Sequence, residues 1–324
     1  MTIVETVRGQ VDSADLGTTL MHEHVFVLTA DVQLNQWDGW DEEGRVAEAV
    51  KKLTELKAVG VDTIVDPTVI GLGRYLPRIQ RINEQVDINI VPATGIYTYN
   101  DVPFYFYYRG PVLDPSAPEP MVDLFVKDIT EGIAGTGVKA AFLKCAIDHQ
   151  GLTPGVERVM RAVAGAHRQT GVPITVHTHP GSQQGLVVRR VLGEEGVDLT
   201  RVVLGHSGDS TDADHLAELA DAGFILGMDR FGIDLILDFE SRVGIVAELC
   251  RRGYAGSMVL SQDASCYIDW LDPAMLPLAL PRWTYTHIHT DVLPALRAAG
   301  VSDADIDTML VANPRRYFEN VGAY

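Results

Sequence analysis

The sequence predicts an α/β fold, a single-domain (β/α)₈ TIM barrel that spans residues 1–324. Short apolar runs rich in β-branched residues alternate with amphipathic stretches, which is the pattern of parallel βα units. Eight such runs can be counted, the number of strands in a closed barrel. No linker, repeat or low-complexity stretch divides the chain, and 324 residues lie within the range of one such barrel.

The predicted strands are nearly continuous hydrophobic runs, as expected for strands buried on both faces. In chain order they are Thr18–His24, Thr63–Thr68, Ile88–Tyr97, Ala140–Ala146, Pro173–His179, Arg201–Ser207, Phe224–Arg230 and Ser257–Asp263.

Three helices have clear sequence boundaries. Apolar residues recur at steps of three and four over Val46–Leu56, before Gly60. Thr153-Pro154 supplies an N-cap and a first-turn proline to a helix that Gly171 closes. Asn313-Pro314 repeats this start for a C-terminal helix.

Two connections are unusually long. Tyr99–Glu119 is rich in aromatic residues and proline, and Ala264–Thr286 is rich in leucine and tryptophan. Long loops at the C-terminal face of a barrel usually shape its substrate pocket, so we expect these two to do so.

The composition excludes several classes of protein. The 26 basic and 44 acidic side chains give a net charge of −18, which disfavours nucleic acid and anionic lipid as partners. No run approaches the ~18–20 apolar residues of a membrane helix. The N-terminus shows no export signal and three cysteines are too few for a disulfide framework, so we expect a cytoplasmic protein.

Residues of the types that bind metals stand at the ends of several predicted strands. His22-Glu23-His24 ends the first, where positions i and i+2 share a face and both imidazoles can converge. A single pair of this kind is a weak signal. His177 closes the fifth run, His206 the sixth and Asp263 the eighth, so all of them would ring one mouth of the barrel. The pattern favours a metal site there.

Lys144 ends the fourth predicted strand at the same mouth. By itself, such a lysine would be one half of a buried ion pair, and its ammonium would be repelled by neighbouring cations. A neutral lysine, however, can react with carbon dioxide to give a carbamate, whose two oxygens can bridge two metals. Beside four histidines and an aspartate we favour this second interpretation.

These residues belong to a longer pattern, through which the whole chain resembles the phosphotriesterase-like lactonases of the amidohydrolase superfamily. The matching segments are Leu20–His24, Asp66–Thr68, Gly95–Tyr97, Leu204–His206, Gly227–Arg230 and Asn313-Pro314. Two positions depart from the family pattern, Gln262 in front of the metal-binding aspartate and Ser265 behind it.

The resemblance implies two divalent metal ions. His22, His24 and Asp263 would hold one, His177 and His206 the other, and carboxylated Lys144 would bridge them. Zinc is the first expectation, although iron, cobalt and manganese suit the same ligands.

The resemblance also implies roles in catalysis. The two ions would lower the pKa of a shared water toward ~7 and give a bridging hydroxide as the nucleophile. Tyr97 would donate a hydrogen bond near the developing oxyanion, and Asp263 would take and return the proton. Arg230 would either fix the lactone ring or hold the loops, two interpretations that the sequence leaves equal.

The implied substrates are N-acyl-homoserine lactones and related aliphatic lactones, with quorum quenching as the role and phosphotriesters as incidental substrates. The last long loop is apolar enough to cover an acyl chain, through Trp270, Leu271, Met275, Leu276, Leu278, Leu280 and Trp283. Its alternative role is a dimer contact, and we expect a homodimer.

Other functions remain open. The first is an organophosphate triester hydrolase, and the second is a catalytically silent barrel that binds a ligand. A metal-dependent nuclease is disfavoured by the charge of −18 and the lack of a basic cluster.

Other polar residues near strand ends have supporting roles. Asp66, Asp209 and Asp229 could orient metal-bound histidines, and Asp209, three residues after His206, is the first choice. Cys145 should face away from the metals because it follows Lys144 on an alternating strand. The remaining histidines are expected in capping, solvent-facing, rim or packing roles; they are His149, His167, His179, His215, His287 and His289.

Overall fold

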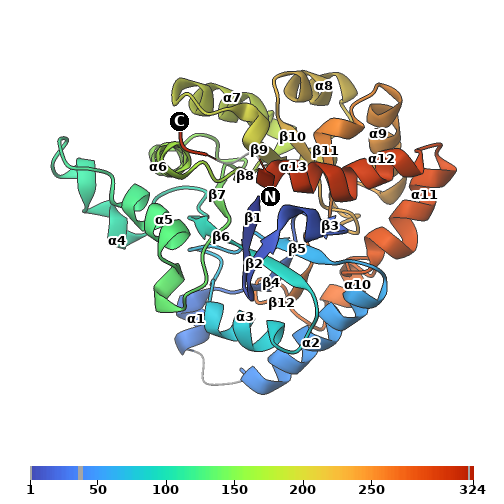
Figure 1. Ribbon diagram of the computed structural model, residues 1–324, viewed down its shortest axis with the longest axis horizontal. Helices are drawn as coiled ribbons and strands as arrows, with labels where there is room; N and C mark the ends of the chain where they lie inside the picture. The colour runs from blue at the N-terminus through green and yellow to red at the C-terminus, as the bar shows by residue number, and fades with distance from the viewer. Residues whose placement is uncertain (1, 36–38, 320–321) are drawn as a thin grey trace.

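The computed structural model, which describes residues 2–35, 39–319 and 322–324, has the predicted parallel barrel (Figure 1). Each barrel strand falls inside its predicted run, and neighbours in the chain pair in parallel. The strands are β3 (Thr19–Leu20), β5 (Thr63–Asp66), β6 (Asn89–Gly95), β7 (Phe142–Ala146), β8 (Ile174–His177), β9 (Val202–Gly205), β10 (Ile225–Met228) and β11 (Met258–Leu260). Between β11 and β3 the Met21 amide donates to the Leu260 carbonyl at 3.4 Å, so the barrel is nearly closed.

The first predicted strand is too long. β3 ends at Leu20, the chain bends, and β4 (His24–Val27) leaves the barrel to pair in parallel with β12 (Ser265–Ile268). The His24 amide donates to the Ala264 carbonyl at 2.8 Å, which joins the two departing segments. His22 and His24 therefore do not lie on one regular strand, so the prediction that strand alternation places them on one face is wrong.

The helices surround the barrel. The helix α6 (Pro154–Thr170) has the predicted boundaries, with the Val156 amide donating to the Thr153 side chain and Gly171 at a φ of 75°. The helix α2 (Glu42–Ala58) ends just before Gly60 as predicted, and it begins one turn before the predicted apolar face. The others around the barrel are α3 (Leu76–Asn83), α5 (Pro120–Thr130), α7 (Gln184–Glu194), α8 (Ala213–Asp221), α9 (Phe239–Arg251) and α11 (Leu293–Ala298).

The last helical segment begins at Asn313 as predicted, but the N-cap role predicted for this residue is wrong. The chain is already helical in α12 (Asp303–Asp307) and passes through a π-helix, η9 (Thr308–Ala312), into α13 (Asn313–Glu319). The wider π turn accommodates Pro314, whose ring would clash with the carbonyl four residues earlier in a regular α-helix. Asn313 does not cap the helix; its side-chain amide donates to the carbonyls of Ala255 at 2.8 Å and Met258 at 2.7 Å.

The core has two layers. One fills the space between strands and helices and includes Cys145, which therefore faces away from the barrel interior as predicted. The other fills the barrel and includes Val4, Phe142, Tyr317 and Phe318. The hairpin of β1 (Ile3–Thr6) and β2 (Gly9–Asp12) leads into the short helix η1 (Ser13–Asp15), which packs against α13. Val4 of the hairpin and Tyr317 and Phe318 of α13 pack inside the barrel, at the end where the strands begin and opposite the predicted metal ligands.

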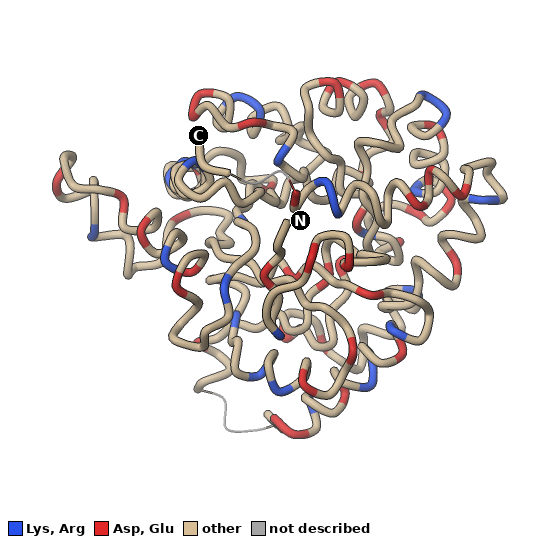
Figure 2. The backbone as a smooth tube through the Cα atoms, viewed as in Figure 1, with Lys and Arg blue, Asp and Glu red and all other residues tan. Residues whose placement is uncertain are grey.

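Both long connections carry structure of their own. The first contains α4 (Phe104–Tyr107), which projects on the left of Figure 1, and the second contains β12 and α10 (Leu276–Ala279). Along the backbone, lysine and arginine are interspersed with the more numerous acidic residues (Figure 2). Among the described residues, no helix is long and apolar enough to span a bilayer.

Candidate metal centre

The six predicted metal ligands converge at one mouth of the barrel, although they come from five separate segments. The Asp263 carboxylate oxygen Oδ1 lies 3.3 Å from His24 Nε2 and 3.5 Å from His22 Nε2. Lys144 Nζ lies 3.5 Å from His22 Nε2. On the other side, His206 Nε2 lies 2.8 Å from Nδ1 of His177. The structure thus brings together every residue that the sequence proposed for the two metals.

Two of these residues have unusual backbone conformations. His206 has a φ of 67° and Asp263 a φ of 55°, in the left-handed region that few non-glycine residues adopt. Such strain persists only where the surroundings enforce it, and it is frequent at functional sites. Close packing adds a second constraint, because a Cβ at Gly95 would lie 1.8 Å from the Lys144 carbonyl oxygen.

The electrostatic environment favours ligand forms of these side chains. Burial lowers the pKa of Lys144 to about 8, which increases the neutral fraction that can react with carbon dioxide. Burial lowers the pKa of His177 to about 3 and that of His206 well below its usual value, so both imidazoles are neutral. Burial raises the pKa of Asp263, but its interactions with His22, His24 and the Arg230 guanidinium lower it well below its usual value, so the carboxylate is ionised.

The donor set fits divalent transition metals. Imidazole nitrogen and carboxylate oxygen are their common protein ligands, and ligation requires neutral histidine and ionised aspartate. The donor atoms of His22, His24 and Asp263 lie within 4.8 Å of one another. His22, His206 and Asp229 form a second such group, but there the carboxylate contacts the Nδ1 atoms, so we assign it to hydrogen bonding.

Asp229, and not Asp209, orients the histidines. Its Oδ2 lies 3.0 Å from His22 Nδ1 and its Oδ1 lies 2.9 Å from His206 Nδ1, so one buried carboxylate fixes both rings. Asp209 instead contacts Arg230 at 3.0 Å and Arg242 at 2.7 Å. The short helix that follows His206 turns Asp209 away from the ring, which is why proximity in sequence misled the prediction.

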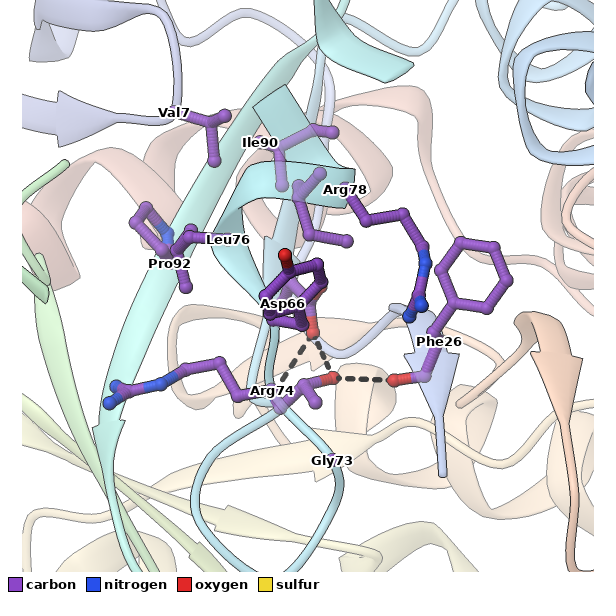
Figure 3. A pocket seen from close by; sticks show the side chains of 12 residues that line it. Val7, Phe26, Asp66, Gly73, Arg74, Leu76, Arg78, Ile90 and Pro92 are labelled. Atoms are coloured by element: carbon purple, nitrogen blue, oxygen red, sulfur yellow. Dashed lines mark hydrogen bonds between the residues drawn. The ribbon is translucent and has the colours of Figure 1, made fainter. Parts of the chain in front are cut away.

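His24 is oriented by a third group, in line with the prediction for Asp66. Its Nδ1 lies 2.7 Å from the Thr68 hydroxyl, which donates to the Asp66 carboxylate. Behind this pair is a cavity of about 20 Å³, the room that one water needs. Figure 3 shows Asp66 in its lining, between Arg74 and Phe26.

Asp148 was missed by the sequence reasoning. Its Oδ2 lies 2.5 Å from His177 Nε2, so this ring presents Nδ1 to the cluster. The only signal was an acidic residue two positions after the end of β7.

A pocket of about 410 Å³ opens above the cluster. All six predicted metal ligands line it. So do all five residues predicted for the substrate pocket, which are Tyr97, Arg230, Trp270, Leu271 and Trp283. The prediction that one loop supplies the apolar wall was incomplete: Ile233, Leu235 and Ile236 from the β10–α9 connection line it too. Of the loop residues named above, Met275, Leu276 and Leu278 do not line it.

Two tyrosines and an arginine border the cluster. The Tyr97 hydroxyl is hydrogen-bonded to that of Tyr99 and lies 3.4 Å from His177 Nδ1. Burial and the neighbouring Tyr99 raise the pKa of Tyr97, so it stays protonated and able to donate. Arg230 donates to Asp263 at 3.2 Å and to Asp209 at 3.0 Å. Tyr99 was missed, although it is two residues after Tyr97.

The two departures from the family pattern are accommodated. The Gln262 side chain donates to the Tyr285 carbonyl and accepts from the Ile288 amide at 3.0 Å, which anchors the end of the last long loop. Ser265 begins β12 and pairs with His24.

Two of the remaining histidines differ from expectation. His167 is buried between the Val172 carbonyl and the Tyr324 hydroxyl, at 2.7 and 2.6 Å, because the C-terminal segment packs over it. His215 is also buried, in the first turn of α8.

Comparison with known proteins gives consistent matches over nearly the whole chain. The model of the Phosphotriesterase family matches residues 2–318. A Mycobacterium tuberculosis protein named phosphotriesterase homology protein is 60% identical over 322 residues, which cover 99% of each chain. An aryldialkylphosphatase of Saccharolobus solfataricus is 40% identical over 96% of this chain and 98% of its own. The solved structure of the phosphotriesterase from Mycobacterium tuberculosis superposes with a TM-score of 0.97 at 59% identity, covering 99% of this chain and 100% of that one.

Proposed function

Because this chain belongs to the phosphotriesterase family of binuclear metal-dependent hydrolases, we propose that its substrates are lactones, above all N-acyl-homoserine lactones, and that it acts in quorum quenching. One observation carries the proposal. The pocket combines the polar ligand cluster, Tyr97, Tyr99 and Arg230 with a lining that is otherwise largely apolar. A lactone with an acyl tail likewise combines a polar ring with an apolar chain.

The residues of the chain have distinct tasks in this reaction. Two divalent cations, zinc in the first instance, held by the six ligands with a carboxylated Lys144, would supply Lewis acidity and hydroxide at neutral pH. The Tyr97 hydroxyl donates to the carbonyl oxygen as negative charge develops there, a contribution of ~3–4 kcal/mol for such donors. Asp263 holds the proton of the attacking water and returns it to the ring oxygen that leaves. Arg230 keeps the Asp263 carboxylate oriented through its 3.2 Å contact.

Triester hydrolysis remains the second candidate, and one observation favours it. The apolar walls come from separate elements, namely the β10–α9 connection, the last long loop, and residues such as Leu72 and Ile268 beside the cluster. Three substituents on phosphorus need several walls of this kind. The aryldialkylphosphatase relative points in the same direction.

A direct comparison of substrates separates the two candidates. The measurement is kcat/KM for acyl-homoserine lactones of graded chain length and for an aryl dialkyl phosphate, on one preparation with analysed metal content. We expect lactones to be preferred and kcat/KM to rise with chain length until the pocket is full. A triester preferred about tenfold or more over every lactone, roughly 1.4 kcal/mol in transition-state binding, would overturn the proposal. No turnover of either class by fully metallated protein would favour the silent barrel.

A further inference from the structure

Glu23 is a fully buried carboxylate that has no role in the reaction described above. It stands between two ligands, His22 and His24, yet does not line the pocket. Both of its oxygens point instead to the segment that carries Asp263. Oε1 accepts the Gln262 amide at 2.8 Å, and Oε2 accepts the Ala264 amide at 2.9 Å.

The residue between these two amides is the one with strained backbone. Asp263 has a φ of 55°, a conformation that costs on the order of 1–3 kcal/mol for a non-glycine residue. A conformation of this cost needs contacts that hold it on both sides. The Glu23 side chain supplies them as two hydrogen bonds, one to the backbone amide on each side of Asp263.

The surrounding backbone completes the arrangement. The Asp263 amide donates to the His22 carbonyl at 3.1 Å, and the His22 amide donates to the Ser261 hydroxyl at 2.8 Å. The Trp283 indole donates to the Gln262 carbonyl at 2.7 Å. Hydrogen bonds thus join the segment of His22 and His24 to the segment of Asp263 at several successive residues. Among the described residues, Glu23 is the only side chain that accepts from the amides on both sides of Asp263.

We propose that Glu23 is a positioning residue that clamps the backbone on both sides of Asp263 and so holds this ligand in its metal-binding conformation before a cation arrives. This inference depends on the family's metal chemistry and not on the choice between lactone and triester. It predicts that damage to the clamp weakens metal binding and turnover but leaves substrate binding unchanged, because Glu23 does not touch the pocket.

The test uses Glu23→Gln, which keeps the size of the side chain but replaces one acceptor with an NH₂ group that faces an amide donor. We expect the dissociation constant of the metals, measured by competition with a chelator, to rise ~10–100-fold, as for other residues that orient ligands. At saturating metal, kcat should fall while KM is unchanged. Glu23→Asp, which keeps a carboxyl group with two oxygen acceptors, should recover part of the metal affinity.

Asp128→Asn is the matched control. Asp128 is also a buried carboxylate of the barrel, but it pairs with Arg74 at 2.9 Å and Thr94 at 2.6 Å, away from the cluster. Its replacement should lower stability and leave metal affinity unchanged. If Glu23→Gln behaves in the same way, the residue supports the core only and the proposal is wrong.

A measurement on the unaltered protein covers the case in which the variants do not fold. Crystal structures with and without metal should both show a left-handed φ at Asp263 and both amide contacts to Glu23. Relaxation of Asp263 to an ordinary φ in the metal-free protein, with the Glu23 contacts intact, would overturn the clamp. Either result leaves the substrate question to the kinetic comparison.

Discussion

At the scale of single residues, the types of side chain at strand ends were sufficient to find the six residues that meet at the mouth of the barrel. Histidines at the ends of several barrel strands are uncommon unless they form one site. This pattern identified His22, His24, His177 and His206. The partners that orient them were harder to predict. Asp229 and Asp148 act on rings from other strands, and only the closure of the barrel determines which carboxylate reaches which nitrogen.

Lys144→Ala should remove both metal binding and activity, since the bridging group would be lost from a fully buried position. Short carboxylic acids should restore part of both because they can occupy the space and supply two oxygens. Metal analysis and a lactone assay measure the effect. Lys139→Ala, shortly before the same strand, is the control. Two retained metals and normal turnover in Lys144→Ala would contradict the bridging role.

Asp229→Asn should weaken metal binding ~10–100-fold, because an amide cannot accept hydrogen bonds from two imidazoles at once. Asp209→Asn should leave metal affinity unchanged, since Asp209 contacts arginines and no ligand histidine. Chelator competition on the two variants measures the difference. Equal losses in both would mean that the orienting role is shared.

At the scale of elements, hydrophobic runs and caps predicted all eight barrel strands, both bounds of α6 and the end of α2. The errors came from features without a local signal. β4 leaves the barrel because it finds a partner, β12, more than 230 residues later in the chain. The role of Asn313 was misjudged because Asn-Pro is typical of an N-cap, whereas here a π turn lets the helix continue through Pro314.

Asn313→Ala should destabilise the fold by about 1–3 kcal/mol, because the buried carbonyls of Ala255 and Met258 would lose their donor. The midpoint of urea unfolding measures the loss, and exposed Asn100→Ala serves as the control. An unchanged midpoint would show that the contact between α13 and β11 contributes nothing.

The two tryptophans of the last long loop should differ in their effects. Trp270→Ala should flatten the rise of kcat/KM with acyl length, since each buried methylene contributes up to ~0.8 kcal/mol. Trp283→Ala should flatten it and also lower kcat for every substrate, because its indole holds the backbone beside Asp263. Kinetics on a lactone series tests both, and an unchanged slope in Trp270→Ala would remove that residue from the acyl site.

At the scale of the whole molecule, alternation of strands and helices was enough to predict one barrel, and the predicted ligands do meet at its mouth. The shape of the pocket was not predictable, since it depends on how two loops fold over the mouth. The association of chains is also a whole-molecule property. The first long connection, Tyr99–Glu119, exposes large apolar side chains, including Phe104, Tyr108 and Leu113, in a protein whose net charge is −18.

We expect a homodimer that covers this connection, because the exposed rings of Phe104, Tyr107 and Tyr108 contact one another and clustered exposed apolar side chains often mark an interface. Light scattering at micromolar concentration should give twice the 35.4 kDa of one chain. The double variant Phe104→Asp, Tyr108→Asp should reduce the mass to that of one chain. A dimer that persists in the double variant would place the interface elsewhere, and a monomeric wild type would contradict the expectation.

In this protein the strand ends carry the predicted metal ligands and the loops carry the apolar pocket walls, and this separation affects how the protein can evolve. Next to Lys144, Gly95 cannot be replaced by a larger residue, since even a Cβ there would clash with the Lys144 carbonyl oxygen. The apolar walls, in contrast, come largely from two short stretches of the chain, 233–236 and 270–283. Substitutions in those two stretches can therefore change the substrate specificity of descendants while the residues at the strand ends, and the chemistry that depends on them, stay the same.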